Sequence, residues 1–259
     1  MFSFFKKKKS VQAQEVEVIE ETDYRDATIV AEYFKNETGV TFDKQLSILT
    51  NKAMTFCTQR GINSFSKLLT LVDTDANIKQ ELIDYLTTNE TFFYREFRQV
   101  EELVGLVKNH FNNVDILCAP SATGEEPYSI AIALLEAGVP SSKFKIVGID
   151  INSEALERAQ IAIYKERNVR NLSKEILTKY FDEQDGLYVL RSSVKSLVTF
   201  KLHNLFEPSF TNIGKFDFIF SRNMFIYFDK ETKVKAKKIL ESMRKNENQE
   251  IFFGHADQL

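Results

Sequence analysis

The chain has 259 residues, of which 43% are hydrophobic and 27% charged, and its formal net charge is −3. These values are typical of a soluble globular protein with one large or two small domains. Nine glycines and four prolines exclude collagen-like and Pro/Gly-rich disordered chains. The acidic balance argues against a nucleic-acid partner. The only cysteines, Cys57 and Cys118, lie far apart, which excludes a disulfide scaffold and fits a cytoplasmic protein. We predict no metal, because no Cys/His/Asp cluster has ligand spacing.

The N-terminus does not resemble an export signal. Lys6 to Lys9 follow a short apolar start, whereas a secretory signal has its positive charge first. We interpret residues 1–20 as a flexible tail; the alternative is a weak attraction of these lysines to an acidic membrane surface. No apolar run reaches about 18 residues, so no membrane-spanning helix is expected.

Residues 24–110 have a helical pattern. Apolar residues recur at three- and four-residue spacing, as at Ile48, Leu49, Met54 and Phe56, and strand-like runs are lacking. Asp43, Ser64 and either Thr74 or Asp75 are candidate N-caps. We predict a bundle of four or five helices, with an N-terminal domain at 21–86 and a second domain at 87–259.

From residue 113 onward, short apolar runs alternate with helical segments. Strands are expected at 114–119, 144–149, 216–220 and 250–253, and helices at 125–137, 154–163 and 231–244. This alternation predicts an α/β fold with a doubly wound parallel sheet. Residues 188–191 and 198–202 indicate a small antiparallel insert, placed at about 182–200, followed by a returning strand.

The first crossover, residues 114–150, has the chemistry of a nucleoside site. The loop after its first strand lacks GxGxxG and the P-loop pattern. Glu125 and Glu126 then open a helix, where they suit the helix dipole but would repel phosphate and attract a cation. Asp150 ends the second strand, where a carboxylate can accept both ribose hydroxyls; the alternative role is an N-cap. A nucleoside with a cation and no phosphate describes S-adenosylmethionine (SAM).

Four segments carry a family resemblance. They are TNETFFYRE at 88–96, APSATGEEPYSIA at 119–131, DIN at 150–152, and FDFIFSRN with IYFD between 216 and 229. Their order and spacing resemble the CheR-type chemotaxis receptor glutamate methyltransferases, over roughly residues 24–255.

The resemblance implies a Rossmann-like SAM-dependent methyltransferase domain with a small inserted β-subdomain, behind an all-α N-terminal bundle. Its implied activity is methyl transfer from SAM to glutamate carboxylates of chemoreceptors, leaving S-adenosylhomocysteine (SAH). Arg95 and Tyr227 would face the substrate carboxylate. The implied cofactor-binding residues are Asn89, Thr91, Arg95, Ala119, Glu125 (at the positive methionine end), Asp150 (at the ribose), Asn204, Leu205, Arg222 and Asn223.

A glutamate nucleophile needs no general base, because its ordinary pKa of about 4.3 leaves it ionised at neutral pH. The implied partner is the cytoplasmic helical domain of methyl-accepting receptors, to whose membrane arrays a monomeric cytoplasmic enzyme would be recruited. Lys44, Lys52 and Arg60 recur at eight-residue steps on one predicted helix and are candidates to meet acidic receptor helices; a solvated face is the alternative. The short insert favours a form that does not grip a receptor C-terminal peptide.

The match is weaker toward the C-terminus. Residues 245–249 replace the Gly pair usual in the family, and GHADQL replaces a more usual GHSESL. We therefore expect the terminal β-hairpin to be missing. The alternative function is a shortened CheR-like module that binds SAM or receptor without turnover.

Overall fold

The computed structural model describes residues 22–249 and 251–257; the predicted tail at 1–20 lies outside them. The N-terminal bundle consists of α1 (Thr28–Thr38), α2 (Leu46–Gln59), α3 (Phe65–Thr74) and α4 (Ala76–Leu86), which share one apolar core. Ser64 caps α3 by accepting from Lys67 N, and Asp75 caps α4 by accepting from Asn77 N. The sequence predicted Ser64 as a cap, and it offered Asp75 as one of two alternatives with Thr74. The cap predicted at Asp43 was wrong, because α2 begins after Gln45, which makes no side-chain cap.

The apolar pattern of α2 is only partly a core pattern. Leu49 and Phe56 are fully buried, whereas Ile48 is 50% and Met54 39% exposed. At 100° per residue, Ile48 and Met54 fall away from the buried face. The four residues were quoted as a helical pattern, and α2 confirms the helix although two of the four lie off its buried face.

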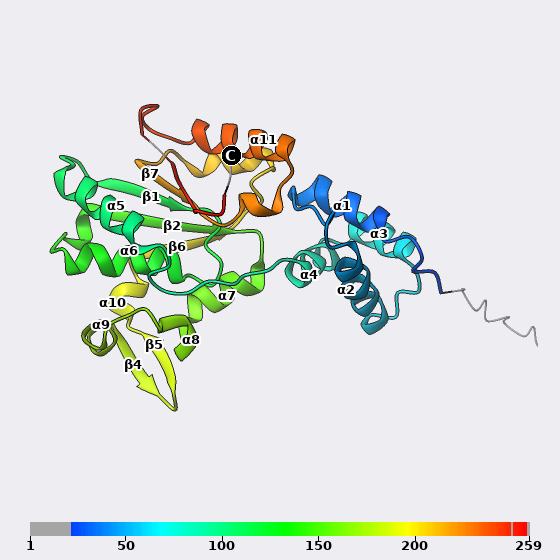
Figure 1. Ribbon diagram of the computed structural model, residues 1–259, viewed down its shortest axis with the longest axis horizontal. Helices are drawn as coiled ribbons and strands as arrows, with labels where there is room; N and C mark the ends of the chain where they lie inside the picture. Colours follow the sequence, from blue (N-terminus) through cyan, green and yellow to red (C-terminus); the bar gives the residue numbers. More distant parts are fainter. Residues whose placement is uncertain (1–21, 250, 258–259) are drawn as a thin grey trace, which may run out of the picture.

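A fifth helix, α5 (Phe97–Asn109), belongs to the other body of the molecule (Figure 1). Its buried residues Val100, Leu103 and Val107 join the core on one face of the sheet. The connection at residues 87–96 joins this helix to the bundle. The bundle therefore has four helices among the described residues.

The large sheet has the strand order β6-β2-β1-β7-β8, and every pairing is parallel. These strands are β1 (Val114–Cys118), β2 (Phe144–Asp150), β6 (Val198–Leu202), β7 (Phe218–Ser221) and β8 (Ile251–Phe253). α6 (Glu125–Glu136) and α5 cover one face, and α11 (Lys230–Ser242) covers the other (Figure 1). Alternate residues of β1 serve both cores: Ile116 faces α6, and Leu117 faces α11. The predicted doubly wound, Rossmann-like α/β fold is confirmed.

A smaller antiparallel sheet, of order β3-β5-β4, projects from this body (Figure 1). It contains β3 (Ile163–Lys165), β4 (Phe181–Gln184) and β5 (Leu187–Leu190), with α8 (Glu166–Val169), α9 (Lys174–Tyr180) and α10 (Ser192–Lys195) around it. The sequence placed the insert at about 182–200. The structure adds β3 at its start, of which only Ile163 fell within the helix expected at 154–163, and it assigns 198–202 to the large sheet as the returning strand. α7 (Ser153–Ile161) ends just before β3 because Ala162 is left-handed.

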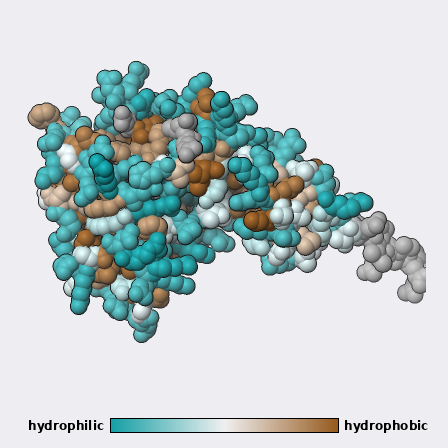
Figure 2. Space-filling view, viewed as in Figure 1, coloured by the Kyte–Doolittle hydropathy of each residue, from teal (hydrophilic) through white to brown (hydrophobic). Residues whose placement is uncertain are grey.

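The described part of the chain also contains 3-10 turns at Ser141–Lys143, Pro208–Ile213 and Phe225–Tyr227. The turn into α6 requires Gly124, whose φ is +92° and whose added Cβ would lie 3.0 Å from both Ala159 and Tyr128. Hydrophilic residues cover most of the face shown in Figure 2. Among the described residues, no helix has both the length and the apolar character to cross a membrane.

Candidate active site

A cavity of about 390 Å³ lies where the bundle meets the carboxyl ends of the large sheet. The bundle contributes the turn after α1, and residues 87–92 form a side wall. The remaining walls are the loops after β1, β2, β6 and β7. Ligands of doubly wound sheets bind at this end of the strands.

The cavity gathers ten of the eleven predicted site residues. These ten residues come from the connection at 87–96 and from the ends of β1, β2, β6 and β7 and the loops that follow them. They are up to 138 positions apart in the chain. They are Asn89, Thr91, Arg95, Ala119, Asp150, Asn204, Leu205, Arg222, Asn223 and Tyr227.

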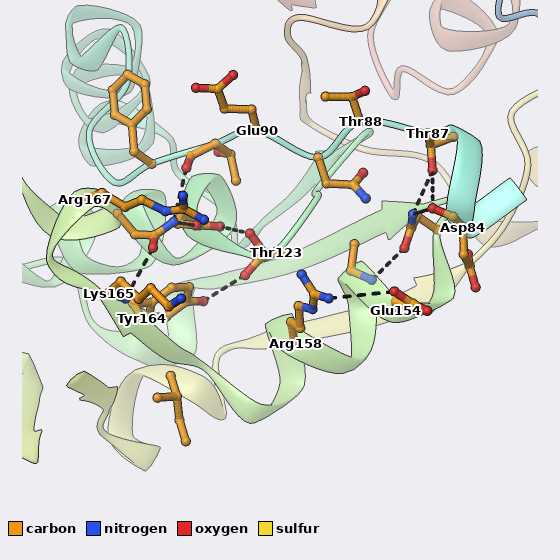
Figure 3. Close-up of a pocket in the computed structure, with 18 of the residues that line it drawn as sticks. Asp84, Thr87, Thr88, Glu90, Thr123, Glu154, Arg158, Tyr164, Lys165 and Arg167 are labelled. Carbon is orange, nitrogen blue, oxygen red and sulfur yellow. Dashed lines mark hydrogen bonds and ion pairs between the residues drawn. The ribbon is translucent and has the colours of Figure 1, made fainter. Parts of the chain in front are cut away.

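Glu125 is the residue that the structure places elsewhere. Its fully buried carboxylate accepts from Thr123 Oγ1 at 2.6 Å and from Asn168 Nδ2 at 2.8 Å, and burial raises its pKa. It lines a second cavity of about 880 Å³, between the bundle and the small sheet (Figure 3). Residues 87–92 form a wall of both cavities. The two predicted binding residues Asn89 and Thr91 therefore stand between them.

Glu126, one residue further along α6, lines the first cavity instead. Its Oε2 is ion-paired with Nε of Arg222, whose side chain is 3% exposed. Its Oε1 is buried and has no hydrogen-bond partner in the part of the chain that the structure describes. Burial raises the pKa of Glu126, and the neighbouring Arg222 opposes that rise. The sequence placed two carboxylates at this helix start, but the choice between them depends on how α6 is rotated.

Asp150 lies at the carboxyl end of β2, with 4% of its surface exposed. One carboxylate oxygen accepts from Ala122 N at 2.7 Å and the other from Asn152 N at 2.9 Å. Burial raises the pKa of Asp150 to about 6. Each oxygen has capacity for a second donor, as a pair of ribose hydroxyls requires. The alternative N-cap role is filled by Asn152, which accepts from Ala155 N.

Arg95 enters the cavity from a backbone with unusual geometry. Tyr94 and Glu96, on either side of it, have φ of 56° and 48°, which is the left-handed region. The Arg95 guanidinium donates to Glu90 O at 3.2 Å and lies 5.6 Å from the Phe92 ring centroid. Among the described residues it has no carboxylate partner within ion-pair distance.

The opposite end of the cavity is apolar. Leu205 and Phe210 are 9% and 1% exposed, and Ile149 lies beside them in the same core. Asn204 lines this end, but its amide donates to Glu37 O at 2.6 Å and accepts from Phe206 N at 2.9 Å. The Asn204 side chain therefore fastens α1 to this loop, and its amide keeps one further N–H and one further lone pair.

Tyr227 lies at the mouth of the cavity and is 36% exposed. Its carbonyl oxygen accepts from Thr41 N at 2.9 Å, which connects the bundle to this wall. Partial burial raises the pKa of Tyr227, so its hydroxyl stays protonated at neutral pH.

The donor set fits SAM better than a phosphorylated nucleotide. An apolar end suits a base, the Asp150 carboxylate suits ribose hydroxyls, and the unpartnered Glu126 Oε1 suits a cationic amino group. Arg95 remains for a carboxylate. Within the described part of the chain, no group of three or more His, Cys, Asp or Glu side chains could hold a metal ion.

Comparison with known proteins agrees with this geometry. The family model described as CheR methyltransferase, SAM binding domain, matches residues 89–259. A chemotaxis protein methyltransferase of Campylobacter jejuni is 35% identical over 220 residues, covering 85% of this chain and 83% of the relative. Similar relatives are the chemotaxis protein methyltransferase of Salmonella typhimurium (32% identity; 83% and 77% coverage) and chemotaxis protein methyltransferase 2 of Vibrio cholerae (31%; 93% and 87%).

A Rossmann-like sheet with this cavity defines a SAM-dependent methyltransferase. The chain belongs to the CheR methyltransferase family.

Proposed function

We propose that this protein transfers the methyl group of SAM to glutamate side chains of chemotaxis receptors, forming methyl esters and releasing SAH. The observation that carries the proposal is the presence, in one cavity, of a SAM-compatible donor set and of Arg95, a cation with no carboxylate partner among the described residues. The names of the relatives, which are chemotaxis protein methyltransferases, support the receptor as the substrate.

In this proposal the cofactor is held at three points. Asp150 accepts the ribose hydroxyls, and Glu126 accepts the amino group through its free Oε1. The backbone around Leu205 and the ring of Phe210 enclose the base. Glu126 replaces Glu125 in the role that the sequence had assigned, because only Glu126 lines this cavity.

The reaction is an in-line displacement, for which bound SAM supplies an activated methyl group on its sulfonium. The receptor carboxylate needs no proton removed, since it is ionised at neutral pH. Arg95 holds one carboxylate oxygen through a charge-assisted bond and leaves the other free to attack. The Tyr227 hydroxyl donates a second orienting bond. Catalysis then rests on positioning, which is worth on the order of 7–11 kcal/mol for well-aligned pairs.

We further propose that the bundle contributes to receptor docking, although its cations are less available than the sequence indicated. Lys44 precedes α2. Lys52 donates to Tyr85 O at 3.3 Å, and Arg60 is ion-paired with Glu81. The three cations therefore do not form an unpartnered row on one helix. Recruitment from the cytoplasm to receptor arrays, and the monomeric state, remain predictions.

The experiment that tests the proposal uses methyl-labelled SAM and receptor-containing membranes. Volatile label released by mild alkali from receptor bands measures glutamate methyl esters. Label that is absent with Arg95→Ala establishes carboxyl methylation at this cavity. SAH binding without alkali-labile label would instead show a module that does not turn over.

A further inference from the structure

The segment after the last strand of the large sheet, residues 254–257, lies behind the active-site wall. Asp257 is 7% exposed, and it does not line the cavity. Its carboxylate accepts three backbone N–H groups, from Asn223, from Gly254 at 3.0 Å and from Ile226 at 3.3 Å. Among the described residues, Asp257 has no cationic partner within ion-pair distance. Its charge is therefore stabilised by backbone amides alone.

Two of these amides belong to the wall that carries predicted active-site residues. Asn223 has a φ of 60°, a left-handed conformation that costs energy for a residue with a side chain. Ile226 lies in the 3-10 turn Phe225–Tyr227, which presents Tyr227 at the cavity mouth. A buried carboxylate that accepts both amides holds this turn in one conformation.

The same segment also reaches the opposite wall. His255 N donates to Glu96 Oε2 at 3.1 Å, and Glu96 directly follows Arg95. Gln99, on the first turn of α5, donates to Phe253 O at 2.7 Å. Residues 253–257 thus contact the Glu96 and Gln99 side chains on the Arg95 side, and the backbone N–H of Ile226 beside Tyr227.

Gly254 makes this approach possible. A Cβ at that position would lie 2.9 Å from Asp257 Oδ2, 3.0 Å from Asn223 N and 3.1 Å from Asn223 Nδ2. The first distance is shorter than real Cβ contacts and the other two are tighter than most of them, so a larger residue requires Asp257 or the wall at Asn223 to shift.

We infer that Asp257 is a positioning residue for methyl transfer, which fixes the turn at residues 222–227 so that Asn223 and Tyr227 face the cofactor and the substrate. The inference rests on the proposed function. Asp257→Asn preserves the size of the side chain but replaces one acceptor oxygen with an NH2 donor, which then faces a backbone N–H donor. At least one of the three hydrogen bonds is lost, and the turn is no longer held in this conformation.

The test compares Asp257→Asn with Asp75→Asn in the full chain. Asp75 also accepts two backbone N–H groups, but at the far end of α4 from the cavity. We expect Asp257→Asn to lower kcat about tenfold or more and to raise the Kd for SAH. The two variants should lower Tm by similar amounts, so that the difference in kcat does not reflect stability. Asp257→Glu should recover part of the lost kcat.

Wild-type kcat and SAH affinity in folded Asp257→Asn would overturn the inference. A fall in kcat no larger than that caused by Asp75→Asn would also overturn it. If Asp257→Asn does not fold, Gly254→Ala and Asp257→Glu provide the test in its place. We expect Gly254→Ala to lower kcat and Asp257→Glu to lower kcat by a smaller factor. Should the wild type release no methanol, the proposed function fails, but the SAH titration still tests whether Asp257 shapes the cavity.

Discussion

Arg222 donates from its guanidinium to the backbone carbonyl oxygen of Arg95 at 3.0 Å. The same nitrogen reaches Glu96 O at 3.3 Å and Gln99 Oε1 at 3.2 Å, while Nε pairs with Glu126. Arg222 therefore uses its charge within the protein, and it holds the backbone from which Arg95 extends. Of these two arginines, Arg95 has no carboxylate partner among the described residues, which is why we propose it, and not Arg222, for the substrate carboxylate.

Replacing Arg95 should separate binding from turnover. Arg95→Ala is expected to abolish methyl-ester formation while SAH still binds, because Asp150 and Glu126 remain. Arg95→Lys should recover only part of the activity, since an ammonium lacks the planar fork of donors. Alkali-labile methanol and SAH calorimetry measure the two effects. Arg98→Ala, at an exposed position on α5, is the matched control, and an equal loss there would refute the assignment.

The two adjacent glutamates should behave differently. Glu126→Gln leaves the buried Arg222 without its charged partner, a change that costs about 3–5 kcal/mol for buried pairs, and it removes the anion next to the cofactor. We expect SAH affinity to fall more than tenfold. Glu125→Gln should keep SAH affinity within about threefold, because Glu125 bonds only to neutral donors in the second cavity. A larger loss of SAH affinity in Glu125→Gln than in Glu126→Gln would instead support Glu125 as the residue at the methionine end of the cofactor.

Asp150 predicts an acid limit to cofactor binding. Its pKa in the folded protein is about 6, so acidification below that value protonates the acceptor of the ribose hydroxyls. The Kd for SAH should rise about tenfold per pH unit below this point. Asp150→Asn should bind weakly and lose most of this pH dependence; an unchanged slope would assign the titration to another group.

The same shift has the opposite effect on folding. The pKa of Asp150 is raised from 3.8 to about 6 by burial, so the folded apo-protein binds more protons than the unfolded chain between these values. The stability that this carboxyl contributes is fully present below about pH 3.8 and is lost as the pH rises through 6. Chemical denaturation of Asp150→Asn and wild type across this range, without ligand, checks the sign.

The docking role of the bundle can be tested at Arg60 without losing its ion pair. Arg60→Glu should raise the receptor KM if this cation meets an acidic receptor, but it also breaks the pair with Glu81. The exchanged variant Arg60→Glu/Glu81→Arg restores a pair of reversed orientation. A KM that stays high in the exchanged variant supports docking, whereas its return to the wild-type value would make Arg60 structural. Lys238→Glu on α11 controls for net charge.

Much of this architecture could be read from the sequence because its signals are local or periodic. The strand–helix alternation predicted the parallel sheet, and side-chain chemistry alone predicted Ser64 as a cap and Asp75 as one of two alternatives. The segment at β3 was missed because three residues carry too little pattern, and Ile163 is 47% exposed. The direction in which Glu125 and Glu126 point could not be predicted, because consecutive helical residues differ by 100° and only packing sets the rotation.

The N-terminal bundle does more than offer a surface for a partner, because it also contacts the cavity wall. Here α1 gives its Glu37 carbonyl to Asn204, and the turn after it gives the Thr41 amide to Tyr227. A fragment starting at residue 87 would retain the complete large sheet and all four loops at its carboxyl ends. It would nevertheless lack one wall of the cavity, so the proposed binding site is built by both bodies of the chain together.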